Sequence, residues 1–397
     1  MITRRNQKTL TSSDRAEFVR ALKVLKNTPS HFTPPTASRY DDFVYVHMQA
    51  MLLLEIVDRT KVLQNGNLKI TSDMRMPMWA HRCPAFFPWH RELLFQLELE
   101  LQKAANDPDL AIPYWDWSVD QSKTAAPWTD DFMGGDGNDG PVISGPFAGS
   151  QNWKLTLSED GLDHLVRGFG LAKDSDTNQL FASNLPTPAD VAASLAVTIY
   201  DKAPWNDTRQ LVSFRNQVEG WYVPSGSPSP VGMHNLVHLW VGGNNGTMLP
   251  STSPNDPVFF LHHCNVDRLW AVWQARNPGV APFLPTSPLP QDPGQSLNEP
   301  MIFYDKALSS TPPWTAPAAT PAHVVDHHIL GYQYDEEASF AMTEETKLEE
   351  VKGREVDPLK QKPLKISAKD HFRKRLEELV VDKDQKKPAS RKPKRRR

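Results

Sequence analysis

Apolar residues recur every three or four positions in several stretches of the chain, which is the period of an amphipathic helix. After Pro88, one predicted helical face carries His90, Leu93, Leu94, Leu97 and Leu101. The same pattern predicts helices over Ser13–Lys26, Tyr40–Lys61, Pro88–Ala105, Asp190–Asp201, Thr208–Gly220 and Asp256–Arg276. Long loops separate these helices, and a short extended segment, Tyr332–Tyr334, follows them. The pattern therefore predicts a mainly α-helical fold with long irregular loops and a few short strands.

Two further segments differ from the helices in composition. Residues 118–153 are rich in Gly, Asp and Pro, which predicts a long surface excursion that lines a site. After Asp335 the residues are mostly charged, so we expect residues 1–340 to form the folded body that carries any functional site. Residues 341–397 are predicted to be a charged, largely flexible extension or linker. We favour this over a nucleic-acid patch for the basic end, Lys386–Arg397.

Composition narrows the class of protein. The chain has 397 residues, of which 39% are hydrophobic, and this allows a sizeable core. A formal net charge of -3 gives the body no electrostatic reason to bind nucleic acid or a membrane, and no apolar run is long enough for a bilayer span. The only cysteines are Cys83 and Cys264, which excludes a disulfide framework and a cysteine-rich zinc site. Any metal must therefore bind to histidine.

Four histidines lie close together in sequence and predict one half of a metal site. His234 and His238 are four residues apart, which places both imidazoles on one face of a helix. The helix predicted from Asp256 would bring either His262 or His263 to the same site. Asn255 and Asp256 are plausible N-cap residues for this helix.

Three earlier histidines predict a second set. His47 lies on the apolar face of the helix predicted from Tyr40, His81 lies in a loop, and His90 lies near the start of the next helix. A set of three imidazoles suits copper, zinc, iron or nickel, and disfavours magnesium or calcium. A three-histidine zinc site would explain only half of the ligands. Two adjacent three-histidine sites fit a pair of copper ions better, and predict oxygen binding or oxidation.

These motifs resemble those of the tyrosinases, in the type 3 copper family, and are most similar to the bacterial enzymes. The resemblance rests on His47, His81 with the Pro-Trp-His-Arg block at His90, the His234-Asn235-x-x-His238 pair, and Asn255-Asp256-Pro257 leading to His262-His263-x-x-x-Asp267. It implies a four-helix core that clasps a dinuclear copper site. It also implies a phenol oxidase that uses O2 to hydroxylate monophenols to o-diphenols and to oxidise these to o-quinones.

The resemblance also implies roles for individual residues. His47, His81 and His90 would bind one copper, and His234, His238 and His263 would bind the other. Phe259 would pack against the copper site. Asp267 lies four residues after His263 and is a candidate acceptor that orients an imidazole. Glu219 and Asn235 would hold a water that deprotonates a phenol, which favours monophenolase activity.

Two positions depart from the family pattern. Plant, fungal and molluscan relatives often carry a cysteine before the second histidine, whereas here Cys83 follows His81, so we expect a small buried thiol. Leu239 stands where some bacterial relatives have a charged residue, which favours an apolar entrance. The charged tail is too short for a whole lid domain, so we expect an accessible site.

Several alternatives share the same histidines. A catechol oxidase or o-aminophenol oxidase would lack monophenolase activity, and a hemocyanin-like protein would carry oxygen. A single copy of the motif set argues against the carrier. We expect small phenolic substrates, no nucleic acid and no membrane, with a copper-delivery partner as a further option and an oligomeric state that the sequence does not indicate. No export signal is visible, so we expect a cytoplasmic protein or one whose signal has been removed.

Overall fold

The computed structural model divides the chain into two compact units. Met1–Leu53 and Pro77–Gln361 form the first unit, and Leu54–Met76 and Lys362–Arg397 form the second. The residues that the structure describes are 1–31, 37–52, 63–64, 67–68, 79–158, 161–173, 178, 180, 182–206, 211–223, 231–289, 292–303 and 319–340. The predicted extension 341–397 lies outside these ranges, so the domain boundary near residue 340 stays a prediction.

The first unit is mainly helical, which confirms the expected fold class. Its α-helices are α1 (Ser12–Asn27), α2 (Arg39–Leu52), α4 (Phe86–Ala105), α5 (Pro188–Leu195), α6 (Phe214–Glu219), α7 (Met233–Gly242), α8 (Val258–Arg276) and α9 (Pro321–Val324). Single 3-10 turns are η1 (Gln7–Thr9), η3 (Gly149–Gln151), η4 (Ser253–Asn255), η5 (His327–Leu330) and η6 (Glu337–Ser339). Short strand pairs join β1 (Ile2–Arg4) to β6 (Tyr332–Tyr334) and β4 (Gly140–Pro141) to β5 (Val166–Arg167). In the second unit, β2 (Leu63–Gln64) pairs with β3 (Asn67–Leu68).

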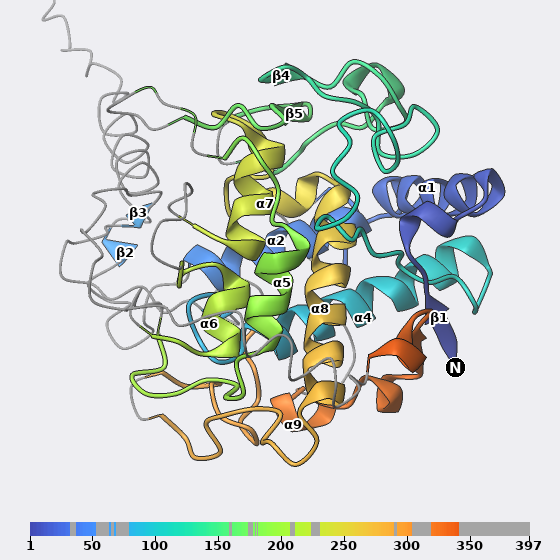
Figure 1. Ribbon diagram of the computed structural model, residues 1–397. Coiled ribbons are helices and arrows are strands. Elements are labelled where there is room, and N and C mark those ends of the chain that lie inside the picture. Colours follow the sequence, from blue (N-terminus) through green and yellow to red (C-terminus); the bar gives the residue numbers. More distant parts are fainter. Residues whose placement is uncertain are drawn as a thin grey trace, which may run out of the picture. The chain divides into compact units, whose positions relative to one another are not determined.

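Helix α8 is the centre of the first unit. Every side chain from Val258 to Asp267 is buried, and the helix shows no exposed stripe over this length, as expected for a helix covered on all sides. Helices α4 and α7 both contact α8, and Figure 1 shows α8 running through the middle of the fold. This position brings the adjacent His262 and His263 into the core.

The observed helices match the predicted ones best where the apolar pattern is longest. α1, α4 and α8 lie within two residues of their predicted ranges, and the predicted part of α2 beyond Leu52 lies outside the described residues. The helix predicted to reach Asp201 is wrong at its C-terminal end, because α5 ends at Leu195, before the run Val197-Thr198-Ile199 of poor helix formers. Asp256 contacts the start of α8 through the Val258 N–H at 3.2 Å, but it mainly pairs with the buried Arg167, at 2.7 and 2.8 Å.

The segment 118–153 runs largely along the surface, as its composition predicts, but several of its side chains are anchored in the core. Trp128, Phe132 and Trp153 are buried, and the Trp128 ring lies 4.3 Å from that of Phe169. The aromatic residues spaced among Gly, Asp and Pro supply enough apolar surface to anchor an otherwise irregular segment in the core.

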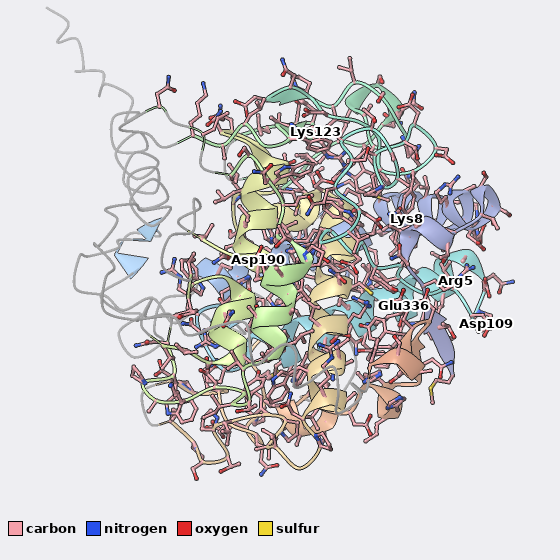
Figure 2. The ribbon with its side chains drawn as sticks, viewed as in Figure 1. Arg5, Lys8, Asp109, Lys123, Asp190 and Glu336 are labelled. Carbon is pink, nitrogen blue, oxygen red and sulfur yellow. The ribbon has the colours of Figure 1, made fainter. Side chains whose placement is uncertain are left out.

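The predicted closing segment is confirmed as β6, which pairs in parallel with β1 at the other end of the described chain. Hydroxyl groups of Tyr332 and Tyr334 donate to Asp267 of α8 at 2.6 and 2.5 Å. Next to this segment, Glu336 pairs with Arg268 of α8 at 2.8 Å, and Glu336 is labelled in Figure 2. The two ends of the folded body are thus fastened to the helix that carries His262 and His263. Among the described helices, none is long and apolar enough to cross a membrane.

Candidate metal centre

The first set of histidines meets in the core as expected. His47 comes from α2, His81 from the loop before α4, and His90 from the first turns of α4. Their ring centroids are 4.8 to 5.7 Å apart, and all three side chains are nearly fully buried. One ligand atom from each lies within 4.8 Å of the others. Three elements that are distant in sequence therefore supply one cluster.

The second set contains four imidazoles rather than three. His234 and His238 lie one turn apart on α7 with ring centroids 4.6 Å apart. Both His262 and His263 of α8 join them, since ligand atoms of all four lie within 4.8 Å of one another. The two neighbours differ in surroundings: His262 contacts rings of this set and Trp117, whereas His263 also stacks on His90 of the first set, at 4.2 Å.

Hydrogen bonds at Nδ1 fix four of these imidazole rings, and in each of them Nε2 stays without a partner in the described chain. The Nδ1 atoms of His47, His90 and His238 lie 2.6 to 2.8 Å from backbone carbonyls of Ser251, Phe86 and Met248, respectively. His234 Nδ1 faces the Glu219 carbonyl at 3.3 Å and Asn235 Oδ1 at 3.0 Å. An Nδ1–H that donates to an oxygen leaves a lone pair on Nε2 and holds the ring in place, as in metal-bound histidine.

The remaining nitrogens are orphaned, which is the structural test of whether a metal fits. In the described part of the chain, the buried Nε2 atoms of His47, His90, His234 and His238 have no hydrogen-bond partner, nor does either nitrogen of His262 and His263. Buried polar atoms almost always have a partner. A cluster of partnerless imidazole lone pairs, with no thiolate or carboxylate among them, fits copper.

Burial keeps these imidazoles neutral. It lowers the pKa of His47 to about 3 and that of His238 to about 4. The pKa values of the other five, His81, His90, His234, His262 and His263, are also lowered by burial and by neighbouring imidazoles. A neutral imidazole is the form that binds a metal. His238 and Asn235 of α7 keep partial exposure, whereas the other six histidines of the two sets are buried.

Phe259 lies against both sets, with its ring centroid 4.1 Å from that of His263 and 4.9 Å from that of His47.

Asp267 does not orient an imidazole, which corrects the expectation from its spacing. Its oxygens accept hydrogen bonds from Arg4 at 3.2 Å and Arg91 at 2.5 Å, besides those from the two β6 tyrosines. Burial alone would raise the pKa of Asp267. The guanidinium groups of Arg91 and Arg4 outweigh this effect and lower the pKa. The Asp267 carboxylate, one helical turn beyond His263, is therefore paired with two buried guanidinium groups.

Glu219 and Asn235 lie together beside His234. The Glu219 carboxylate is buried and accepts the Arg82 backbone N–H at one oxygen and Arg215 Nη1, at 2.8 Å, at the other. Burial raises the pKa of Glu219, and Arg215 opposes that rise. The buried amide nitrogen of Asn235 has no partner among the described residues.

Sequence reasoning missed several residues that support the centre. Arg215 bridges Glu219 and Asp201, with 2.8 Å to each. Its position four residues before Glu219 on a helix was the available signal. The backbone carbonyl groups of Ser251 and Met248, which face Nδ1 of His47 and His238, could not be predicted from the sequence, because every residue has a backbone carbonyl. Cys83 is a buried thiol as expected, and burial raises its pKa.

Comparison with known proteins agrees with the geometry. The family model for the common central domain of tyrosinase matches residues 37–276. The chain belongs to the tyrosinase family. Tyrosinases are dinuclear copper enzymes that use O2, and the two histidine clusters could hold the copper.

Relatives match over most of the chain. The tyrosinase of Streptomyces antibioticus is 39% identical over 330 residues, which cover 82% of this chain and 97% of that protein. Grixazone synthase of Streptomyces griseus is 35% identical, over 84% of this chain and 99% of that protein. The solved structure of deoxygenated hemocyanin from Rapana thomasiana has a TM-score of 0.51 at 20% identity, over 88% of this chain and 73% of that one. The last likeness is one of fold.

Proposed function

We propose that this tyrosinase-family chain hydroxylates monophenols to o-diphenols and oxidises o-diphenols to o-quinones with O2. The observation that carries the proposal is the pair of neighbouring clusters of buried imidazoles. In the described part of the chain, no hydrogen-bond partner is found for the Nε2 atoms of His47, His90, His234, His238, His262 and His263. Bound copper would supply the exchange of electrons with O2. The chain's own residues would hold the ions, exclude bulk water and assist the removal of the phenol proton.

We assign His47, His81 and His90 to one copper and His234, His238 and His263 to the other. The choice of His263 over His262 is supported by ring contacts. His263 lies against His90 and Phe259, so its ring is at the boundary between the two sets. Among the described rings, His262 contacts those of its own set and Trp117. The carbonyl partners of the Nδ1 atoms would keep Nε2 of His47, His90 and His238 directed at the ions.

We propose that Glu219 and Asn235 position a water that takes the proton of a monophenol. Water between them would accept from the Asn235 amide, which has no partner in the described chain, and donate to the Glu219 carboxylate. Arg215 would favour the ionised carboxylate, which a proton acceptor needs. An o-diphenol is oxidised more easily and depends less on this water. Phenols would enter past His238 and Leu239, the partly exposed residues of α7.

The test uses copper-loaded protein and a matched pair of substrates, 4-methylphenol and 4-methylcatechol, with oxygen uptake as the readout. The proposal predicts that both consume oxygen and form the same o-quinone. Oxidation of the catechol alone would assign the chain to the catechol oxidases. Reversible oxygen binding without turnover of either would replace the enzyme with a carrier.

We also propose that a separate partner delivers the copper, because most of the ligand side chains are buried. Loading the metal-free chain with free copper ions tests this idea. Slow or partial loading of the folded protein, and full loading when copper is present during refolding, would support a delivery partner. Rapid and complete loading of the folded protein would contradict it.

A further inference from the structure

Outside the copper centre, the described part of the chain holds one further group of clustered metal-ligand atoms, near the C-terminal end of the folded body. Asp326, His327 and His328 each offer one such atom, and these lie within 4.8 Å of one another. Both histidines belong to η5, between α9 and β6. His327 is 4% exposed, whereas His328 and Asp326 face solvent. The group is therefore anchored in the core on one side and reachable from water on the other.

A fourth residue, Glu337 of η6, completes the donor set. The Nε2 atoms of His327 and His328 lie 2.9 and 2.8 Å from the same carboxylate oxygen, Oε1 of Glu337. The two imidazole rings lie side by side with centroids 4.1 Å apart. Two imidazole nitrogens beside one carboxylate oxygen form a donor set typical of zinc and other borderline divalent ions. In such a site the ion replaces the imidazole protons that the carboxylate would otherwise attract.

The other nitrogen of His328 is already held as in a metal-bound histidine. His328 Nδ1 lies 2.9 Å from Asp326 Oδ1, and the same oxygen accepts the His328 backbone N–H at 3.0 Å. This carboxylate contact fixes the ring and leaves Nε2 for the ion. His327 is fixed by packing, because its ring lies 5.3 and 5.8 Å from those of Tyr332 and Tyr334. Both candidate ligands are thus oriented before an ion arrives.

We propose that His327, His328 and Glu337 bind a divalent transition-metal ion, with Asp326 as the residue that orients His328. Zinc suits the three donors, with a water as the fourth ligand. The site stands apart from the six copper ligands, shares no residue with them, and does not depend on the phenol oxidase function proposed above.

The position of the site suggests a structural role for the ion. η5 and η6 flank β6, whose two tyrosines donate to Asp267 on α8. An ion bound by residues of both η5 and η6 would link the two turns on either side of β6. Because an ion that binds only the folded state stabilises it, zinc should raise the melting temperature of the protein.

The test adds zinc sulfate to the copper-loaded full chain, removes loosely bound metal by desalting, and counts zinc and copper by mass spectrometry. We expect one zinc per chain, no loss of copper, and a higher melting temperature. His328→Ala and Glu337→Gln should each weaken zinc binding by at least about tenfold with copper unchanged. Asp326→Asn, which can still cap η5, should weaken it by about 10- to 100-fold. His164→Ala is the matched control, since His164 also pairs with a neighbouring aspartate, Asp163, but belongs to no cluster of metal-ligand atoms in the described chain.

Three results would overturn the proposal: no zinc retained by the wild-type chain, zinc bound equally well by His328→Ala and Glu337→Gln, or zinc taken up only in exchange for copper. Both substituted side chains are partly exposed, so the variants should fold, and an unchanged copper count verifies this in the same sample. The copper count also separates this proposal from the ligand assignment of the phenol oxidase.

Discussion

The imidazole rings of His90 and His263 stack with their centroids 4.2 Å apart and their planes 12° from parallel. One ring comes from α4 and the other from α8, so each belongs to a different histidine set. The stacking of these two neutral rings brings the two sets into direct contact, and Nε2 of each ring has no hydrogen-bond partner in the described chain. This contact is the reason that we treat the two clusters as one dinuclear centre.

The first prediction separates the two adjacent histidines of α8. His263→Ala should lose one of two bound copper ions, and His262→Ala should retain both, because only His263 lies at the boundary between the sets. Copper per chain after desalting is the measurement, with circular dichroism to verify the fold. Equal copper loss in both variants would leave the choice of His263 without support, and the reverse order would assign the ligand to His262.

The second prediction concerns the proposed water site. Asn235→Ala should lower kcat/KM for 4-methylphenol by about 100-fold, in the range expected when assisted proton transfer is lost, and should affect 4-methylcatechol much less. Asn244→Ala is a matched control, because Asn244 follows α7 and bonds to Asp139 at 2.8 Å, away from the histidines. Its ratio of monophenol to diphenol turnover should stay at the wild-type value. A proportional loss on both substrates in Asn235→Ala would refute the water-holding role.

The third prediction concerns the buried ion pairs that join Arg4 of β1 and Arg91 of α4 to Asp267 of α8. Asp267→Asn should lower the free energy of unfolding by about 3 to 5 kcal/mol, because it leaves the guanidinium groups of Arg4 and Arg91 buried without full compensation. Chemical unfolding of the wild-type and variant proteins measures the change. Glu17→Gln, which breaks the exposed pair with Arg20, should leave stability unchanged. A similar small effect of both substitutions would contradict the importance of the buried network.

The fourth prediction follows from the lowered histidine pKa values. In the copper-free protein, His47 has a folded-state pKa of about 3, well below that of an unfolded histidine, about 6.5. Below pH 6.5 the unfolded chain takes up a proton that the folded chain does not, so stability falls as the pH falls towards the folded-state value. At pH 5 this histidine alone should cost about 2 kcal/mol relative to pH 7.

Unfolding of copper-free protein by urea at pH 7, 6 and 5 measures this dependence. His47→Ala should show a shallower fall, and His31→Ala, which removes an exposed imidazole, should follow the wild type. A stability that stays level from pH 7 to pH 5 would show that the imidazoles are not held neutral by burial.

The helical fold and the pairing of His234 with His238 could be predicted from the sequence because both depend on local spacing. The four-residue interval between His234 and His238 specifies a shared helical face, and α7 confirms it. The partners of Asp267 could not be predicted in this way. Arg4 lies 263 positions away in the chain, and it reaches Asp267 only because β1 pairs with β6. Spacing placed Asp267 on the correct helix, but long-range charge pairing decided its role.

The pair on α8 shows a second limit of local geometry. Adjacent residues project about 100° apart on a helix, which predicts that only one of His262 and His263 faces the site. In the structure both rings reach the cluster, because α8 is buried on all sides and α7 covers the face that carries His262. The segment 118–153 lies largely at the surface as its composition predicts, but the composition did not indicate which aromatic side chains anchor it in the core.

Copper per chain tests the central claim most directly, in the wild type and in one variant from each histidine set. Loaded wild-type protein should hold two copper ions, and His47→Ala and His234→Ala should each hold one. The account predicts that both variants also lose oxidation of 4-methylcatechol, since the chemistry needs the pair. A single copper in the wild type, or two coppers retained in either folded variant, would contradict the dinuclear centre described here.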